Sequence, residues 1–506
     1  MGSEMCIRDR AMADEGHIGR RRFLALAGAG AAGLLAGRLG AAEARPRKPN
    51  VVVIISDDQG YADVGVQGCK DIPTPHLDSI AKSGVRFTNG YVSCPVCSPT
   101  RFSIMTGKYP SRHDATNWFS GKRSGRYNPA PLNDEMPLGE VTLAEALKEH
   151  GYKTAFLGKW HLGSDEKYWP EHQGFDINVG GWAVGSPRGG YFAPFDNPRL
   201  GDYPKGSHLP KVLTDESLKI LDQYKDDPFL LYLAFYSVHT PLQGREDLVE
   251  KYKAKRQRVL DELESEFGLE EQVWPSGKER QVRIRQCHAV YAAMVEAMDE
   301  QIGRVLDKLQ ALGIDDHTAV FLMSDNGGLS TSEGSPTSNC PLRGGKGWLY
   351  EGGIREPMII KWPGVGKSGS TCDVPVISTD FYPTILQMAG LKARPDQHVD
   401  GVNIAGLVQG TTKPDRKAIY WHYPHYGNQG GSPGGAIRLG DWKLIEFYED
   451  NRVELYNLKK DIGEKNDLAA KMPQKAKQLR DMLGAWRKEV DAKMPTPNPN
   501  YKPRTK

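Results

Sequence analysis

The chain has 506 residues, of which 39% are hydrophobic and 25% charged, as in an ordinary globular protein. Its 66 basic and 63 acidic residues leave a formal net charge of +3, so no global basic field favours nucleic acid as a partner, and any anion has to be bound at a local site. This length is enough for one large core and a smaller module.

Residues 1–44 have the pattern of an export signal. An arginine run at Arg20–Arg22 precedes an apolar stretch rich in Ala, Gly and Leu, and small residues flank Glu43 at its end. This order is typical of a twin-arginine signal. Because Arg38 interrupts the stretch, it is too short and too weakly apolar for a membrane span. We therefore expect a periplasmic or secreted protein that begins near Arg45 and has no membrane anchor in its mature form.

Beyond this signal, short apolar runs alternate with amphipathic helical stretches. Strands are predicted at residues 51–55, 154–157, 229–235, 319–323 and 357–360. Helices are predicted at residues 77–83, 143–150, 214–224, 290–312 and 381–389, with 246–271 as a charge-rich helical insertion at the surface. The alternation predicts an α/β fold in which a large mixed, mostly parallel sheet is sandwiched by helices.

The pattern changes near residue 395. Short segments at 418–420, 435–438, 442–447 and 453–458 predict a small antiparallel sheet, and a helix is predicted at 473–490. The chain is thus expected to comprise the export signal at 1–44, an α/β catalytic domain at 45–395 and a smaller C-terminal α+β domain at 396–506.

Two of the predicted strands lead into oxygen-bearing side chains. These are Asp57 and Asp58 after the first strand, and Asp325 and Asn326 after the fourth. Each pair alone is more often part of a turn. Because ligands bind beyond the carboxyl ends of parallel strands, however, the two pairs are expected to meet in one crevice. There they suit a hard divalent cation such as calcium and offer little to zinc or copper.

Two further strands lead into basic side chains. Lys159 and His161 follow the second strand, His239 follows the third, and Lys346 lies further along between glycines. Each of them alone is more often a solvated or hydrogen-bonded residue, and the glycines can be ordinary turn residues. Together they suit the binding of an anionic group, and the glycines beside Lys346 would let the backbone approach that group closely.

The segment Cys97-Ser98-Pro99-Thr100-Arg101 places a thiol near the guanidinium of Arg101, a planar group that is always positively charged. Pro99 fixes its own φ and disfavours helix at the preceding residue, so a turn is expected here. A free cysteine is often just a small buried hydrophobe. Cys94 forms a C-x-x-C pair with Cys97, which leaves a redox disulfide as a second alternative.

The stretch from Pro95 to Gly107 resembles the signature of type I sulfatases, in which this cysteine is oxidised to formylglycine. The resemblance extends from about Asn50 to residue 480, and over this range the sequence is similar to arylsulfatases and N-acetylgalactosamine sulfatases. It implies an alkaline-phosphatase-like fold and one calcium ion held by the modified Cys97 with the four oxygen-bearing residues Asp57, Asp58, Asp325 and Asn326. It also implies a formylglycine-generating enzyme as the partner during maturation.

The resemblance further implies the role of each basic residue. The hydrated aldehyde at Cys97 would attack sulfur, and Arg101 would stabilise its deprotonated form. Lys159 and Lys346 would bind the sulfuryl oxygens. His239 would bind substrate and protonate the departing oxygen, and His161 would take the proton that allows sulfate to leave. The expected substrate is a sulfated carbohydrate or an aryl sulfate.

Substrate-binding positions outside these motifs are predicted less directly. His422 and His425 are candidates because the second domain of the family borders the cleft, and residues 189–194 are candidates for the same reason.

Two alternative functions remain open. A phosphonate or phosphate ester hydrolase of the same superfamily needs a similar cradle for a tetrahedral oxyanion. If Cys97 stays a thiol, the pocket would suit a non-catalytic protein that binds sulfated glycans.

Overall fold

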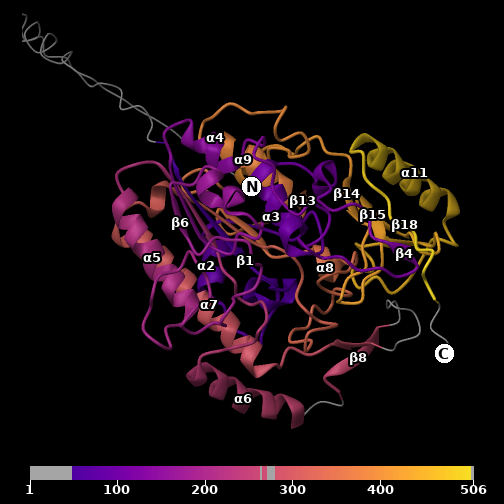
Figure 1. Cartoon of the computed structure of the whole chain (residues 1–506), viewed down its shortest axis with the longest axis horizontal. Coiled ribbons are helices and arrows are strands. Elements are labelled where there is room, and N and C mark those ends of the chain that lie inside the picture. Colours follow the sequence, from indigo (N-terminus) through magenta and orange to yellow (C-terminus); the bar gives the residue numbers. More distant parts are fainter. Residues whose placement is uncertain (1–47, 262–264, 271–279, 503–506) are drawn as a thin grey trace, which may run out of the picture. The chain divides into compact units, whose positions relative to one another are not determined.

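The computed structural model describes residues 48–261, 265–270 and 280–502 (Figure 1). The predicted export signal lies outside these residues. Within the described part of the chain, no helix has both the length and the apolar character needed to cross a bilayer.

The main sheet has eight strands in the order β12-β2-β11-β10-β1-β7-β5-β6. All of its pairings are parallel except those of β11, which runs antiparallel to both β10 and β2. This confirms the predicted mixed, mostly parallel sheet. The strands are β1 (Asn50–Ser56), β2 (Val85–Phe87), β5 (Lys153–Gly158), β6 (Ile177–Val179), β7 (Phe229–Ala234), β10 (Thr318–Ser324), β11 (Met358–Lys361) and β12 (Ser370–Cys372).

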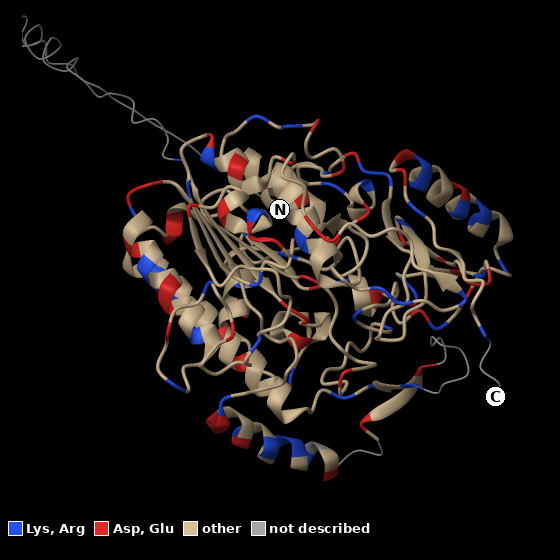
Figure 2. Cartoon of the chain, in the orientation of Figure 1, with Lys and Arg blue, Asp and Glu red and all other residues tan. Residues whose placement is uncertain are grey.

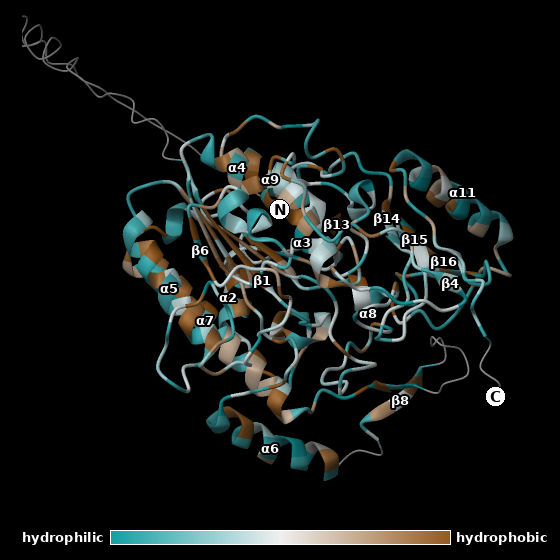
Figure 3. Cartoon of the chain, viewed as in Figure 1, coloured by the Kyte–Doolittle hydropathy of each residue, from teal (hydrophilic) through white to brown (hydrophobic). Residues whose placement is uncertain are grey.

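Helices cover both faces of this sheet (Figures 1 and 3), which is why its central strands are mostly apolar runs. Every residue of β1 is buried. Val51, Val53 and Ile55 pack into one apolar cluster with helices α3, α4 and α9, and Val52 and Ile54 pack into another with α2, α5 and α7. The helices are α2 (Pro75–Ser83), α3 (Cys97–Thr106), α4 (Leu143–Lys148), α5 (Leu209–Tyr224), α7 (Ala289–Ala311) and α9 (Phe381–Met388).

A second sheet of four antiparallel strands follows, as expected from the sequence. It consists of β14 (Ile419–Tyr423), β15 (Gly434–Leu439), β16 (Trp442–Phe447) and β17 (Val453–Asn457), and helix α11 (Pro473–Glu489) packs on it. Trp421 of β14 donates its indole N–H to the Val92 carbonyl at 2.7 Å. Apolar residues of both sheets belong to one cluster, so the predicted boundary near residue 395 does not separate two cores.

Short elements complete the described part of the chain. They are β3 (Gly90–Tyr91), β4 (Tyr127–Asn128), α8 (Glu351–Ile354), β13 (Val376–Ile377), α10 (Ala405–Gln409) and β18 (Thr496–Pro497).

The charge-rich insertion is only partly helical, so the prediction of one helix over 246–271 was wrong at its C-terminal end. Helix α6 (Glu246–Asp261) carries charges along its length (Figure 2). It is followed by β8 (Phe267–Glu270), which pairs with β9 (Arg280–Arg283) in an antiparallel ribbon. Arg283 holds this ribbon against the main body through its backbone N–H, which donates to the Ser330 carbonyl at 2.9 Å. Tertiary contact thus overrides the local helical pattern.

Candidate active site

The carboxyl ends of β10, β1, β7 and β5 are neighbours, and backbone hydrogen bonds continue the pairing just beyond them. The Asp57 N–H donates to the Ser237 carbonyl at 2.8 Å, and the Asp325 N–H donates to the Ser56 carbonyl at 3.1 Å. The Lys159 N–H donates to the Ala234 carbonyl at 2.8 Å. The sheet thus brings the predicted acidic and basic residues together at one edge, as its topology requires.

Cys97 is the first residue of helix α3 rather than part of a turn. Pro99 is tolerated there because the first helical turn has no intrahelical partner for a backbone N–H at that position. The expectation of a turn at Ser98 was therefore wrong. The helix N-terminus directs its dipole toward the Cys97 side chain, where it favours negative charge. Burial nevertheless raises the pKa of the thiol, against the influence of Lys159 and Lys346.

Arg101 follows Cys97 by one helical turn and therefore lies on the same face of α3. Its Nε and Nη2 lie 2.8 and 2.7 Å from Oδ2 of Asp325, and its Nη1 donates to the Lys159 carbonyl at 2.6 Å. Both members of this ion pair are buried. Burial opposes the charged guanidinium, but Asp325 and Asp57 outweigh it and raise the pKa of Arg101. Arg101 thus joins α3 to the ends of β10 and β5.

The two aspartates beyond β1 are each paired with a lysine. Nζ of Lys159 lies 2.7 Å from Asp57 Oδ2, and Nζ of Lys346 lies 2.6 Å from Asp58 Oδ1. The Asn326 amide donates to the same Asp58 oxygen at 2.8 Å.

Three oxygens in this acidic group have no hydrogen-bond partner although they are buried: Asp57 Oδ1, Asp58 Oδ2 and Asn326 Oδ1. Leaving such acceptors unsatisfied is costly, and a cation in contact with them removes the penalty. Ligand atoms of Asp57, Asp58 and His239 lie within 4.8 Å of one another. The donor set, mostly carboxylate and amide oxygens, fits a hard divalent cation.

The electrostatics of the two aspartates differ. Burial and the neighbouring Asp325 raise the pKa of Asp57 to about 8, although Lys159 acts in the opposite direction. For Asp58, burial also favours the neutral acid, but Lys346 and His239 outweigh it and lower its pKa. Burial thus favours the neutral acid at both positions, and the neighbouring charges cause the difference between them.

The two histidines lie on either side of Cys97. Nδ1 of His161 is 3.5 Å from the Cys97 sulfur. Nδ1 of His239 contacts the Thr240 carbonyl at 2.6 Å, so this nitrogen carries the hydrogen and Nε2 faces Asp58 at 3.8 Å. Burial together with nearby cations lowers the pKa of His161, and burial followed by Lys346 lowers the pKa of His239 to about 3.

Two of these residues have left-handed backbone conformations, which are uncommon outside glycine. Asp58 has φ 60° and His161 has φ 57°. Such strain concentrates at functional sites, where the surrounding structure maintains it. Gly185 leaves room for the His161 side chain, because a Cβ at position 185 would lie 2.2 Å from the imidazole ring. Only glycine allows this approach.

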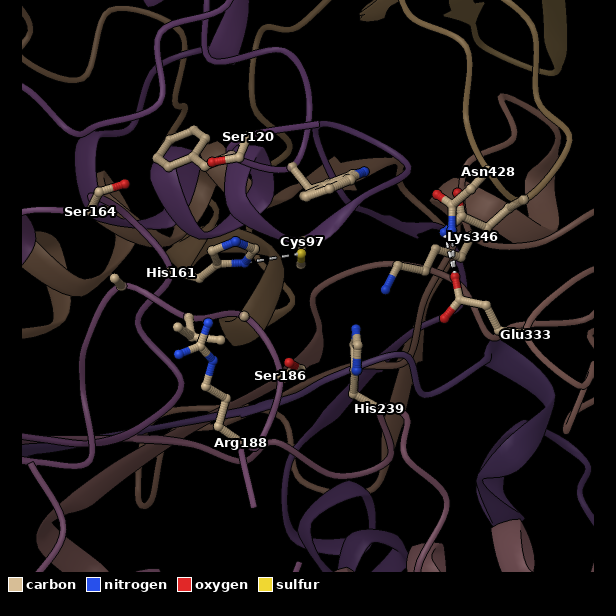
Figure 4. A pocket seen from close by; sticks show the side chains of 16 residues that line it. Cys97, Ser120, His161, Ser164, Ser186, Arg188, His239, Glu333, Lys346 and Asn428 are labelled. Carbon is tan, nitrogen blue, oxygen red and sulfur yellow. Dashed lines mark hydrogen bonds between the residues drawn. The ribbon is translucent and has the colours of Figure 1, made fainter. Parts of the chain in front are cut away.

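A cavity of about 540 Å³ opens over Cys97 (Figure 4). This volume lies in the range of small-molecule sites. Of the predicted site residues, it is lined by Cys97, His161, His239 and Lys346. Asp57, Asp58, Arg101, Lys159, Asp325 and Asn326 are buried behind it.

The structure does not bring His422 and His425 into this group. His422 is buried and contacts the Tyr448 hydroxyl at 2.7 Å and the Lys493 carbonyl at 2.9 Å. His425 is buried and contacts Thr116 Oγ1 at 2.8 Å. Neither lines the cavity, and of the predicted stretch 189–194 no residue does so either. Tyr191 instead donates its hydroxyl to the His239 carbonyl at 2.8 Å.

The comparison with protein families agrees with this geometry. The family model described as "Sulfatase" matches residues 49–391, which is more than half of the chain. The chain belongs to the sulfatase family. A second model, "N-sulphoglucosamine sulphohydrolase, C-terminal", matches residues 345–489. The protein is thus a sulfuric ester hydrolase of the type I sulfatases, as its motifs predicted.

Similar proteins cover nearly the whole of this sulfatase. A "Sulfatase" of Formosa agariphila is 31% identical over 87% of this chain and 89% of its own length. The mouse "N-acetylgalactosamine-6-sulfatase" is 30% identical over 79% of this chain and 72% of its own. Among solved structures, "Ps i-CgsB" is 29% identical with a TM-score of 0.70, over 87% of this chain and 93% of that one.

Several residues that line the cavity of the sulfatase were missed in the sequence. Trp118, Arg188, Glu333 and Asn428 all come from irregular loops. No motif marks them. The only available signal was the neighbouring pair Gly189-Gly190, which pointed to the right loop but to the wrong residues.

Proposed function

We propose that this sulfatase hydrolyses sulfate monoesters on sulfated carbohydrates, with a formylglycine derived from Cys97 as the nucleophile. The observation that carries the proposal is the position of Cys97 at the start of α3, where it lines a cavity together with His161, His239 and Lys346. Support for a carbohydrate comes from relatives. Several are named N-acetylgalactosamine-6-sulfatase, and "Ps i-CgsB" was solved in complex with k-i-k-neocarrahexaose.

The position of Cys97 suits a modified side chain. When hydrated, formylglycine supplies a hydroxyl that can attack sulfur, which divides one difficult hydrolysis into two easier steps. The N-terminus of α3 favours negative charge on that oxygen. Arg101 keeps Asp325 in place behind it through two contacts shorter than 3 Å.

The acidic group behind the cavity suits the metal that the family implies. The carboxylates of Asp57, Asp58 and Asp325 and the amide oxygen of Asn326 would hold a divalent cation, calcium by family likeness, which supplies electrostatic stabilisation for the sulfuryl oxygens. Lys346 lines the cavity and would contact those oxygens directly. Lys159 is fully buried against Asp57, and its contact with sulfate stays a prediction.

We assign opposite proton transfers to the two histidines, following the family likeness. The lowered pKa of His161 keeps it neutral near pH 7, which is the form a base requires, and its Nδ1 lies 3.5 Å from the Cys97 sulfur, the atom that an oxygen replaces in formylglycine. His239 would give a proton to the departing sugar oxygen. Burial and then Lys346 lower the pKa of His239 to about 3, and the Asp58 carboxylate, 3.8 Å from Nε2, is the neighbour that acts in the opposite direction, so the role of His239 as the acid stays a prediction.

The test is sulfate release from a panel of defined sulfated monosaccharides and polysaccharides, together with the intact mass of the peptide that contains Cys97. We expect sulfate release and a peptide lighter than the unmodified thiol. Faster turnover of phosphate or phosphonate esters than of the matched sulfate ester would favour the related hydrolase instead. A thiol at Cys97 with tight glycan binding and no turnover would favour the non-catalytic alternative.

We propose in addition that maturation requires a formylglycine-generating enzyme and that the protein is exported through its twin-arginine signal. Expression without the modifying enzyme should give protein with a free thiol and no activity. Replacing Arg20 and Arg21 by lysine should retain the protein inside the cell, which fractionation measures.

A further inference from the structure

The walls of the cavity carry opposite charges outside the catalytic group, and this points to a particular kind of substrate. We propose that the cavity selects saccharides with a second anionic substituent near the sulfate ester, which pairs with Arg188, while Glu333 on the opposite wall accepts hydrogen bonds from sugar hydroxyls. This inference rests on the proposed function and names the substrate class of the same site.

Arg188 is the cation available to such a substituent. It lines the cavity and is exposed, and within the described part of the chain its guanidinium has no carboxylate partner. The guanidinium lies over the ring of Trp182, 5.8 Å from the centroid. Trp182 is itself tied to the catalytic group, because its carbonyl accepts a hydrogen bond from the His161 N–H at 3.1 Å. Arg188 thus contacts the residue whose backbone carbonyl is hydrogen-bonded to His161.

Arg188 is well suited to carboxylate or sulfate. Its planar fork can donate two parallel hydrogen bonds to either group, which gives orientation as well as affinity. Lys346, by contrast, already pairs with Asp58 and lies beside the sulfate position. The cavity thus provides two separate cations, one for the ester to be cleaved and one for a second anion.

Glu333 makes the opposite wall of the cavity negatively charged. Oε1 accepts hydrogen bonds from the Asn428 and Gln429 amides at 2.7 and 3.0 Å, and Oε2 accepts one from the Thr240 hydroxyl at 3.3 Å. These donors hold the carboxylate in place, and Oε2, which accepts only one of them, retains capacity to accept another hydrogen bond. A fixed carboxylate attracts hydroxyls and repels anions.

The two residues lie on opposite sides of Cys97 (Figure 4). A saccharide with its sulfate ester at Cys97 therefore has one preferred orientation, with the second anion toward Arg188 and free hydroxyls toward Glu333. A second sulfate and a uronic acid carboxylate share the required chemistry.

The experiment measures kcat/KM of the holoenzyme on four substrates. They are nitrophenyl sulfate, a monosulfated disaccharide, the same disaccharide with a second sulfate, and the same disaccharide with a uronate carboxylate in place of that sulfate. We expect the wild type to prefer the last two over the monosulfated disaccharide by at least about tenfold, as expected for a hydrogen-bonded charge pair. The two dianionic substrates show which group the site takes.

Arg188→Ala should reduce this preference at least about tenfold through KM, and Arg188→Lys should restore part of it. Because Arg188 is exposed, added salt should also weaken the preference of the wild type. Arg258→Ala is the matched control, since Arg258 is exposed on α6 and does not line the cavity. It should keep the preference of the wild type.

Glu333→Gln tests the other wall. It should lower kcat/KM for the disaccharides several-fold more than for nitrophenyl sulfate, which has no hydroxyls to donate. An equal loss on all substrates would contradict the hydroxyl role. A wild type that releases sulfate without preferring a second anion, or an Arg188→Ala variant that keeps the preference, would overturn this inference alone. No sulfate release from any substrate would overturn the proposed function and this inference together.

Discussion

Two regions of the molecule bury charged side chains, and the partners of these side chains differ between the two regions. Where the two sheets meet, Lys443 of β16 lies 2.9 Å from Glu351 and 2.8 Å from Glu464, and the Tyr91 hydroxyl donates to Glu351 at 2.6 Å. Beyond the ends of β1 and β10, by contrast, buried oxygens of Asp57, Asp58 and Asn326 have no partner.

The difference distinguishes charges that are buried to stabilise the fold from charges that are buried to bind a ligand. At the junction of the sheets, Lys443 lies within 3 Å of both buried carboxylates, and Glu464 Oε1 has no hydrogen bond besides this ion pair, so removing the lysine exposes the carboxylates to an uncompensated penalty. At the strand ends, the chain leaves acceptors free, which is unfavourable unless a ligand binds there. The four predictions below test this distinction, from the largest expected effect to the smallest.

Cys97→Ala should reduce sulfate release by at least about 10⁴-fold, as expected for removal of a nucleophile. Because only a small buried side chain changes, the melting temperature should stay within a few degrees of the wild type. Turnover by the holoenzyme and thermal unfolding measure the two effects. Cys372→Ala, on β12 and away from the cavity, is the control and should retain activity. Substantial sulfate release by Cys97→Ala would refute the proposed nucleophile.

Lys443→Met should destabilise the fold by about 3–5 kcal/mol, because it leaves Glu464 buried without its cation and Glu351 with only the more distant Arg355, 3.3 Å away. Chemical unfolding measures this loss. Activity per folded molecule should change little. Lys459→Met, at an exposed position, is the matched control and should unfold like the wild type. A variant with normal stability and reduced turnover would give this network a functional role and erase the contrast between the two regions.

Removal of divalent metal should destabilise the wild type and abolish turnover. Calcium restored at about 100 times its dissociation constant should return about 2.7 kcal/mol of stability. Thermal unfolding with a chelator and with added calcium or magnesium measures the shift. Asp58→Asn should lose most of the calcium response, whereas Asp226→Asn, at an exposed position, should keep it. An unchanged melting temperature across these conditions would contradict a cation at the strand ends.

Gly185→Ala should lower kcat about tenfold or more with little change in stability, because the added methyl displaces the His161 ring. Steady-state kinetics and thermal unfolding separate the two quantities. Gly201→Ala is the control, since no atom lies within 4 Å of the Cβ it would add. If both variants had wild-type turnover, the position of His161 would not matter to the rate.

The central strands of the main sheet could be predicted because they are buried on both faces and so appear as continuous apolar runs. Strands β2, β6 and β12 were not predicted, because each is only three residues long and none is a buried apolar run. Its topology then places Asp57, Lys159, His239 and Asp325 at neighbouring strand ends, and the sequence motifs identify them. These parts depend on local pattern and on a general rule for parallel sheets.

The remaining features depend on tertiary packing. Pro99 suggested a turn, but a proline fits the first turn of α3, so local propensity gave the wrong element. Arg188 and Glu333 lie on loops whose positions are fixed only when distant segments pack around them. His422 resembled a pocket residue in the sequence, yet it is buried against Tyr448.

The depth of Cys97 has a consequence for the order of events in biosynthesis. Its side chain is 2% exposed, and every residue of α3 is buried. A cavity of about 540 Å³ admits a sugar but not the catalytic centre of another enzyme. Any enzyme that chemically alters this cysteine must therefore meet it on the nascent or unfolded chain, before α3 has packed, and once folding is complete such an enzyme no longer reaches the thiol.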